Sequence, residues 1–154
     1  MPRHPDTTTL RAPGGGEVSC RLAVTFARRF VGLMGRRSLP PATGLLFAPG
    51  GSIHTAFMRF PIDVVFIDED GVVVDVAARV RPWRHASGSG SFVLELAAGE
   101  AGRLGFLVGE RLQLAGEGLT WRSFDTKRRA PWGRRRRERP DGGRTFGQGE
   151  LDLR

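Results

Sequence analysis

The sequence predicts a mainly β fold: a small closed or sandwich-like β-barrel with one or two short helices, followed by a disordered basic C-terminal tail. Short apolar runs separated by turn residues every ~8–12 positions are typical of small barrels and sandwiches. Val, Leu, Ile and Phe are concentrated between Val18 and Leu114. Residues 1–118 hold 13 Arg and 11 acids, whereas residues 119–154 hold 11 basic residues and 5 acids. The positive charge is therefore that of a tail rather than of the whole fold.

The chain of 154 residues suits a single domain with appended segments. We expect a flexible leader at residues 1–16, a folded domain at 17–116 and an Arg-rich, disordered tail at 117–154. The leader is rich in Pro, Thr and Gly and lacks the apolar run of a signal peptide. No run approaches the ~18 apolar residues of a membrane-spanning helix. These observations favour a soluble cytoplasmic protein. The lone Cys20 excludes an intramolecular disulfide.

The N-terminal half of the domain begins with strict alternation of apolar and polar residues over 18–25, which predicts a half-buried strand. The period then changes. Phe26, Phe30, Leu33 and Met34 lie on one helical face, and Gly35 is a plausible end of that helix. A Pro-rich loop at 40–41 follows.

Two short strands are expected at 44–48 and 53–58, on either side of a Pro-Gly-Gly turn. A strongly apolar strand at 62–68 and a second strand at 72–80 form a hairpin. The turn between them ends in Gly71, which adopts positive φ without steric cost.

The remaining elements are a polar loop at 81–91, a strand at 91–96, a short helix at 98–104 and a last strand at 111–114. No internal repeat is present.

Four separated segments resemble the DUF192 (UPF0127) family. Arg29–Arg36 resembles its "R-x-x-G-L-M-x-R" motif, and Gly44–Phe47 its "G-M-L-F" motif. Ile53–Asp68 is similar to "M-x-x-x-P-L-D-x-x-F-x-D" in an "I-H-T" variant. Val93–Leu96 with Gly99 resembles "V-L-E-L-x-x-G", and Gly109-Glu110 resembles a closing "G-D". The resemblance covers residues 17–116. It departs from the family pattern at Leu45, Ala56 and Glu110. It implies a compact β-rich fold and little about chemistry.

Asp63 is the most informative polar residue because it interrupts an apolar strand. A buried carboxylate is costly unless it is hydrogen-bonded or paired. Asp63 therefore either accepts backbone hydrogen bonds that close a turn after Pro61 or lines a pocket. The candidate ligand-binding set consists of Arg29, His54, Arg59, Asp63 and Glu95.

An alternative is an enzyme in which Asp63, Glu95 or His54 transfers protons. It requires these side chains to converge, whereas Glu95 could simply face water. His85 is a further base in the 81–91 loop.

Several other sites are disfavoured. Cys20 alternates with core residues and is interpreted as buried. Cu(I) binding by Cys20, Met34, His54 and Met58 is less plausible than core packing. No serine elbow, phosphate loop or zinc spacing is present, so we expect no cofactor and no metal.

The basic tail forms a third candidate site. Basic and aromatic side chains there can contact phosphates and bases of a nucleic acid, or an anionic lipid surface. A solvated tail without a partner is equally compatible with this composition. The residues are Lys127, Arg128, Arg129, Trp132, Arg134, Arg135, Arg136 and Arg137.

Three functions follow from the sequence. The favoured one is a non-enzymatic binding or accessory module for an unknown small molecule or protein, with a small polar site around Asp63. The others are proton-transfer catalysis and weak, non-specific nucleic-acid or lipid binding through the tail.

Overall fold

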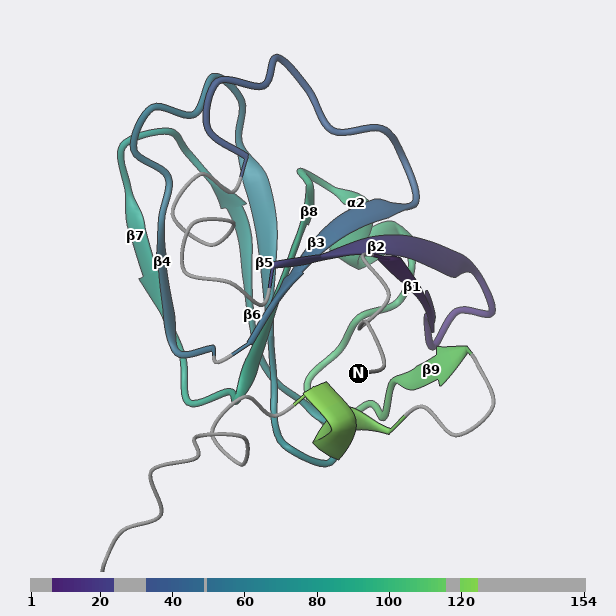
Figure 1. Ribbon diagram of the computed structural model, residues 1–154. Helices are drawn as coiled ribbons and strands as arrows, with labels where there is room; N and C mark the ends of the chain where they lie inside the picture. Colours follow the sequence, from purple (N-terminus) through teal and green to yellow (C-terminus); the bar gives the residue numbers. More distant parts are fainter. Residues whose placement is uncertain (1–6, 24–32, 49, 116–119, 125–154) are drawn as a thin grey trace, which may run out of the picture.

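A computed structural model of the chain describes residues 7–23, 33–48, 50–115 and 120–124. A seven-stranded sheet with the order β6-β5-β8-β3-β2-β1-β9 forms the body, and a two-stranded ribbon, β4-β7, lies beside its β5–β6 side (Figure 1). The strands are β1 Thr7–Arg11, β2 Glu17–Ala23, β3 Thr43–Phe47, β4 Ser52–His54, β5 Ile62–Ile67, β6 Val73–Val80, β7 His85–Ser87, β8 Phe92–Ala97 and β9 Gln113–Ala115. The described helices are α2 Glu100–Arg103 and the 3-10 helix η1 Trp121–Phe124.

The predicted mainly β class is confirmed. Among the described strands, β2 and β3 pair in parallel and the other neighbours pair antiparallel. In the described part of the chain, the two edge strands, β6 and β9, do not pair with each other. An isolated bridge between Val72 and Arg111 joins the chain just ahead of them. The barrel of the predicted closed or sandwich-like β-barrel is therefore not confirmed, because the described sheet is not closed.

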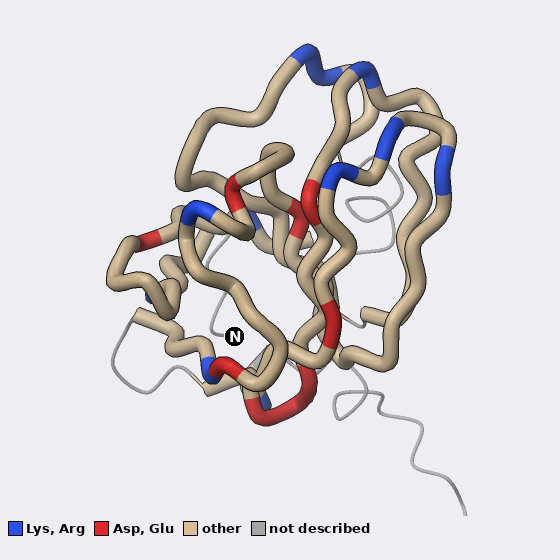
Figure 2. The backbone as a smooth tube through the Cα atoms, turned by 180° about the vertical axis from the view of Figure 1, so that it is seen from behind, with Lys and Arg blue, Asp and Glu red and all other residues tan. Residues whose placement is uncertain are grey.

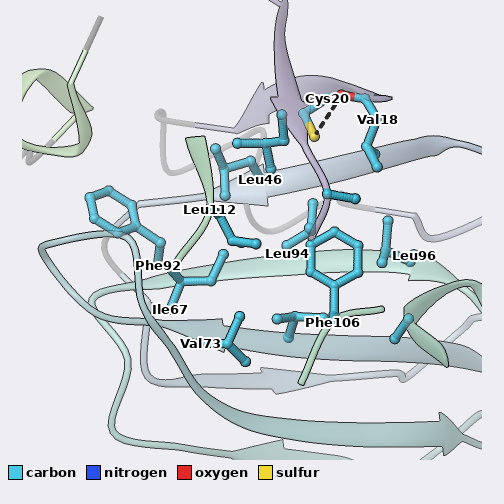
Figure 3. Close-up of a cluster of buried hydrophobic side chains, with 14 of the residues drawn as sticks. Val18, Cys20, Leu46, Ile67, Val73, Phe92, Leu94, Leu96, Phe106 and Leu112 are labelled. Atoms are coloured by element: carbon cyan, nitrogen blue, oxygen red, sulfur yellow. Dashed lines mark hydrogen bonds between the residues drawn. The ribbon is translucent and has the colours of Figure 1, made fainter. Parts of the chain in front are cut away.

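The sheet is covered on both faces at β5, the strand next to the edge strand β6, where all six residues are buried. Val65 and Ile67 point into one hydrophobic cluster together with Leu94 and Phe92 (Figure 3). Val64 and Phe66 point the other way, into a second cluster that contains Ala86 of the β4-β7 ribbon. Strands buried on both faces read as continuous apolar runs, which is why this strand is strongly predicted.

The N-terminal segment differs from the flexible leader that its composition suggests. Thr7–Arg11 forms β1, which pairs antiparallel with β2 in the register Leu10↔Val18. The glycine run makes the turn between the two strands, where the Ala12 N–H donates to the carbonyl of Gly16 at 2.8 Å. Leu10 is fully buried. A single buried leucine in a Thr-rich segment gives too weak an alternation to predict a strand.

The packed part of the chain also extends past the expected boundary at 116. Trp121 is buried, and its indole N–H donates to the carbonyl of Leu112 at 3.0 Å. Its ring lies 5.1 Å from that of Phe92. It also lies against Gly71, where a Cβ would come within 2.0 Å of the indole. Trp121 is therefore a core residue that stands in a segment expected to be tail.

Other sequence expectations differ in detail. The expected strand at 53–58 ends at His54, and the expected loop at 81–91 contains β7. Most of the expected helix around residues 26–34 lies outside the described residues, although Leu33 is buried in the second cluster.

Candidate functional site

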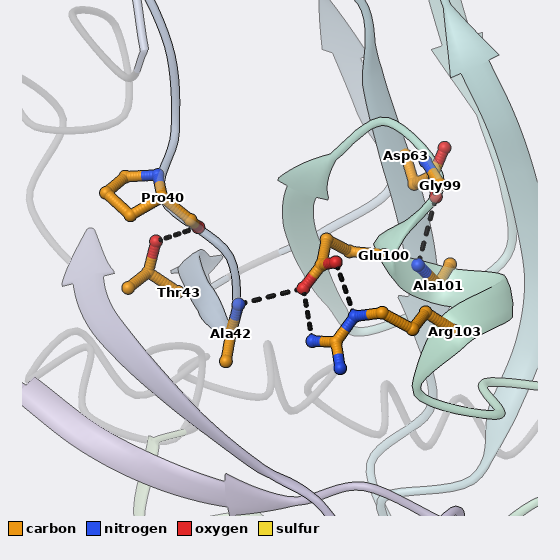
Figure 4. A network of polar contacts seen from close by, with 8 residues as sticks. All are labelled: Pro40, Ala42, Thr43, Asp63, Gly99, Glu100, Ala101 and Arg103. Carbon is orange, nitrogen blue, oxygen red and sulfur yellow. Dashed lines mark hydrogen bonds and ion pairs between the residues drawn. The ribbon is translucent and has the colours of Figure 1, made fainter.

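Asp63 serves the fold through three backbone hydrogen bonds, and Figure 4 shows it beside two of its partners, Gly99 and Ala101. Its Oδ1 accepts from the N–H of Arg79 at 2.9 Å. Its Oδ2 accepts from the N–H groups of Gly99 and Ala101 at 2.8 and 3.0 Å. The prediction that Asp63 accepts backbone hydrogen bonds is confirmed. Its partners, however, lie on β6 and at the start of α2, rather than in a turn after Pro61.

The geometry around Arg79 explains why the fold places a carboxylate there. The pairing of β5 with β6 shifts register between Ile62↔Val80 and Val64↔Ala77, so β6 carries a bulge opposite Asp63. Arg79 has φ 53°, in the left-handed region. A bulge leaves a backbone group outside the strand ladder. Asp63 supplies the acceptor that this N–H would otherwise lack.

Asp63 and Glu95 do not form a catalytic pair. In the β5–β8 ladder Asp63 is opposite Leu96, and Val64 is opposite Glu95. Residues directly opposite each other share a face, and successive residues alternate between faces. The two carboxyl groups therefore point to opposite sides of the sheet. The alternative of proton transfer by this pair requires the two side chains to converge, and the register places Asp63 and Glu95 one residue out of phase.

Glu95 is buried rather than water-facing, with 4% of its surface exposed. It lies on the face of the second hydrophobic cluster, opposite Leu45 on one side and Val64 on the other. Within the described part of the chain, its Oε2 atom has no hydrogen-bond partner. Burial away from water raises the pKa of this carboxyl to about 8. Glu95 is therefore largely protonated at neutral pH.

Cys20 is a core residue, as the alternation predicts. It is fully buried in the first cluster, and its Sγ contacts the carbonyl of Val18 at 3.6 Å. Burial raises the pKa of the thiol to about 12. The thiolate that a nucleophile requires is therefore not formed at neutral pH.

The remaining predicted site residues lie in different places. His54 ends β4, directly opposite His85 of β7, and both are exposed. Arg59 is exposed in the loop between β4 and β5. Arg29 lies outside the described residues, as does every tail residue predicted to contact nucleic acid or lipid. The described candidates thus divide between the β4-β7 ribbon and the main sheet, and do not form a common pocket.

Phe57 and Trp83 form a feature that the sequence analysis missed. They lie in separate loops, after β4 and before β7, and are 64% and 61% exposed. Their rings stand edge to face with centroids 4.7 Å apart. Both residues have positive φ, 62° for Phe57 and 60° for Trp83. Non-glycine residues adopt this conformation rarely, and such strain is concentrated at functional sites.

Thr55 holds these two loops together and is fully buried. Its hydroxyl accepts from the N–H of Arg84 at 2.8 Å and lies 2.6 Å from the carbonyl of Arg81. Its backbone carbonyl accepts from the N–H groups of Trp83 and Met58 at 3.0 and 3.2 Å. The two loops that carry Phe57 and Trp83 are therefore joined to each other by hydrogen bonds of Thr55.

Three arginines lie close in sequence to the aromatic pair. Arg59, Arg81 and Arg84 lie in the same two loops and are exposed. We call Phe57, Arg59, Arg81, Trp83 and Arg84 the aromatic–arginine face. Figure 2 shows several blue segments along the upper end and right side of the view, while other blue segments lie lower, among the red ones.

The sequence contains no Asp or Glu between Glu17 and Asp63, or between Asp75 and Glu95. These two acid-free stretches contain both loops of the face. They are the sequence signal that could have indicated it.

The model of the DUF192 family, described as "Uncharacterized ACR, COG1430", matches residues 8–114. The chain belongs to the DUF192 family. The UPF0127 protein PF1050 of Pyrococcus furiosus is 33% identical to it over 104 residues, covering 62% of this chain and 86% of that protein. A UPF0127 protein of Thermococcus sibiricus is 34% identical over 102 residues, covering 60% and 63%.

Two solved structures share the fold of this DUF192 domain. The "putative transcription regulator" of Sinorhizobium meliloti 1021 has a TM-score of 0.63 and 30% identity, covering 71% of this chain and 92% of that one. A protein of unknown function from Novosphingobium aromaticivorans has a TM-score of 0.60 and 28% identity, covering 71% and 89%. The family resemblance seen in the sequence is confirmed, and the biochemical role of the family is uncharacterised.

Among the helices that the structure describes, none is long and apolar enough to cross a membrane.

Proposed function

We propose that this domain is a non-enzymatic module that binds single-stranded nucleic acid on its aromatic–arginine face. Bases stack on Trp83 and Phe57, and phosphates pair with Arg59, Arg81 and Arg84. The observation that carries the proposal is the exposed aromatic pair, held by hydrogen bonds of the buried Thr55 in two loops that contain no acidic residue.

The aromatic pair has a physical cost that binding would offset. Left-handed φ at a non-glycine residue costs on the order of 1–3 kcal/mol. Two large apolar rings in water also forgo the stabilisation that burial would provide. Stacking of a base on an aromatic side chain contributes ~1–3 kcal/mol and tolerates any sequence because every base has a π-face. A face of this kind therefore favours a single strand over a duplex, whose bases are already stacked.

The cations of the face suit phosphate. All are arginines, whose planar guanidinium donates two parallel hydrogen bonds to phosphate and also stacks on bases. The basic segment that contains Lys127, Trp132 and Arg134 would add further phosphate contacts. These contacts would be independent of nucleotide sequence and would weaken as the salt concentration rises.

One relative supports the proposal. The Sinorhizobium meliloti protein, 30% identical to this chain, carries the description "putative transcription regulator". That description is compatible with the nucleic-acid partner proposed for this chain.

The proposal replaces the small polar site expected around Asp63. The three backbone hydrogen bonds of Asp63 already occupy its carboxylate. Proton transfer by Asp63 and Glu95 together lacks support because the two groups lie on opposite faces. Of the residues first expected at that site, Arg59 belongs to the aromatic–arginine face, and His54 directly precedes Thr55, which links its two loops.

Fluorescence anisotropy of the full chain with a labelled oligothymidylate tests the proposal. Trp83→Ala and Phe57→Ala should each weaken binding by about tenfold, the loss of one stacking contact. Leu107→Ala is the matched control, because Leu107 is also 64% exposed and lies outside the face. It should leave affinity unchanged.

A second arm uses vesicles with and without anionic lipid, since aromatic and basic residues also suit a membrane surface. Binding to anionic vesicles that depends on Trp83, without binding to the oligonucleotide, would overturn the proposal. Equal loss in Leu107→Ala and Trp83→Ala would overturn it as well.

A further inference from the structure

We infer that His54 and His85 form a binding site for a divalent transition-metal ion of the Zn²⁺, Ni²⁺ or Cu²⁺ class. The inference is independent of the proposed nucleic-acid role. It starts from the β4-β7 ribbon, in which Ser52 is opposite Ser87, Ile53 opposite Ala86, and His54 opposite His85. Imidazole is the side chain that these ions prefer.

The hydrogen-bond pattern brings the two histidines close together. The N–H of Thr55 donates to the carbonyl of Arg84 at 2.9 Å, so the bond flanks the His54–His85 pair instead of joining its members. His54 and His85 are therefore a non-hydrogen-bonded pair. In such pairs the Cα atoms are ~4.5 Å apart and the side chains are at their closest. A metal ion that holds each nitrogen at ~2.0–2.1 Å needs the two nitrogens only ~3.3 Å apart.

Both imidazoles lie on the solvent side of the ribbon. Ala86 is buried in the second cluster and Ile53 packs against it, so the alternate residues face outward. His54 and His85 are exposed, as are Ser52 and Ser87 on the same side. A metal ion can therefore reach the pair without any change in the fold.

The protein would fill only part of the coordination sphere of the metal ion. Within residues 7–23, 33–48, 50–115 and 120–124, no group of three or more His, Cys, Asp or Glu side chains is placed to hold a metal. The two imidazoles would supply two ligands, and water or an external ligand would complete the coordination. An open site of this kind exchanges ligands readily, in contrast to a closed structural zinc site.

The position of the pair ties the metal to the two loops of the aromatic–arginine face. His54 directly precedes Thr55, at the start of the loop that carries Phe57. His85 directly follows Arg84, at the end of the loop that carries Trp83. A bound ion would link the end of β4 to the start of β7, where the two loops begin and end, and would stabilise the folded ribbon.

Two measurements on the full chain test the site. Titration with Ni²⁺ and Zn²⁺, followed by calorimetry, should give one ion per chain. His54→Ala and His85→Ala should each weaken binding at least tenfold, because one imidazole alone cannot chelate the ion, and the double variant, which has neither ligand, should show no binding at this site. The midpoint temperature of thermal unfolding should rise by several degrees when the free metal concentration is 100 times the dissociation constant. Neither His54→Ala nor His85→Ala should show this rise.

The control variants are Ser52→Ala and Ser87→Ala, on the same side of the same ribbon. They should bind metal as the unsubstituted chain does, and all variants should unfold at a similar temperature without metal. His4 is present in every variant, so binding that survives in the double variant would overturn the site. A change of less than twofold in either single variant would also overturn it.

Discussion

The hydroxyl of Thr55 accepts a hydrogen bond from the N–H of Arg84 at 2.8 Å, while the Thr55 N–H donates to the Arg84 carbonyl at 2.9 Å. This two-way link connects the loop that carries Phe57 to the loop that carries Trp83. It makes the aromatic–arginine face a property of the fold, because the residue that makes both hydrogen bonds is fully buried.

Replacing Thr55 with Val should loosen the face. Valine has the shape of threonine but leaves the N–H of Arg84 without its side-chain acceptor. A buried unpaired donor costs ~1–3 kcal/mol. We expect urea unfolding to show a loss of that size, accompanied by weaker oligonucleotide binding. Thr43→Val is the control, since its hydroxyl makes an exposed hydrogen bond to Pro40. An equal loss of stability in both variants would argue against the role of Thr55.

Replacing Asp63 with Asn should destabilise the fold and leave binding intact. The amide keeps one acceptor oxygen and removes the negative charge that strengthens three backbone hydrogen bonds. Hydrogen bonds to charged groups contribute ~1.5–3 kcal/mol each. We expect a loss of about 2–4 kcal/mol in the free energy of unfolding. Asp75→Asn, on an exposed carboxylate of β6, should cost much less. If the Asp63→Asn variant is folded but no longer binds the oligonucleotide, Asp63 belongs to the binding site and its role is more than structural.

Glu95 should make stability fall as pH rises. Burial raises the pKa of Glu95 from 4.5 to about 8 in the folded chain. Between these two values, the folded chain retains a proton that the unfolded chain releases. Its contribution is therefore fully present below pH ~4.5 and is lost progressively up to pH ~8. Denaturant titrations from pH 5 to 9 should show this decline, and Glu95→Gln should flatten it. A stability profile with the same slope in both proteins would show that Glu95 ionises normally.

The position of Trp121 predicts where the chain can be shortened. A chain ending at residue 124 keeps this buried tryptophan, whereas one ending at 118 loses it. Removing a buried Trp side chain costs ~3–5 kcal/mol. We expect the shorter chain to unfold well below the longer one in thermal melts. The longer chain should retain oligonucleotide binding with a shallower salt dependence, because the basic residues beyond 124 are gone.

The sequence predicted the elements that carry strong local signals. β5 is buried on both faces and β2 alternates strictly, so each is visible from its own residues. β1 and Trp121 escaped prediction because their burial depends on partners distant in sequence. Leu10 is covered only once β1 pairs with β2, and Trp121 once it reaches Phe92.

The candidate site was harder to predict for the same reason. Asp63 and Glu95 were each correctly marked as unusual, but the face to which each points depends on strand register. Phe57 and Trp83 come from different loops, and neither is unusual alone. They become a surface only when Thr55 joins those loops.

The most direct test of the nucleic-acid proposal is an NMR titration that follows the indole N–H signals. Trp83 belongs to the aromatic–arginine face and is 61% exposed. Trp121 is buried, and its indole N–H donates a hydrogen bond to the carbonyl of Leu112. Adding oligothymidylate to the full chain should shift the Trp83 signal in proportion to occupancy and leave the Trp121 signal in place. Saturable oligonucleotide binding that leaves the Trp83 signal unmoved, or no binding at low salt, would contradict the account.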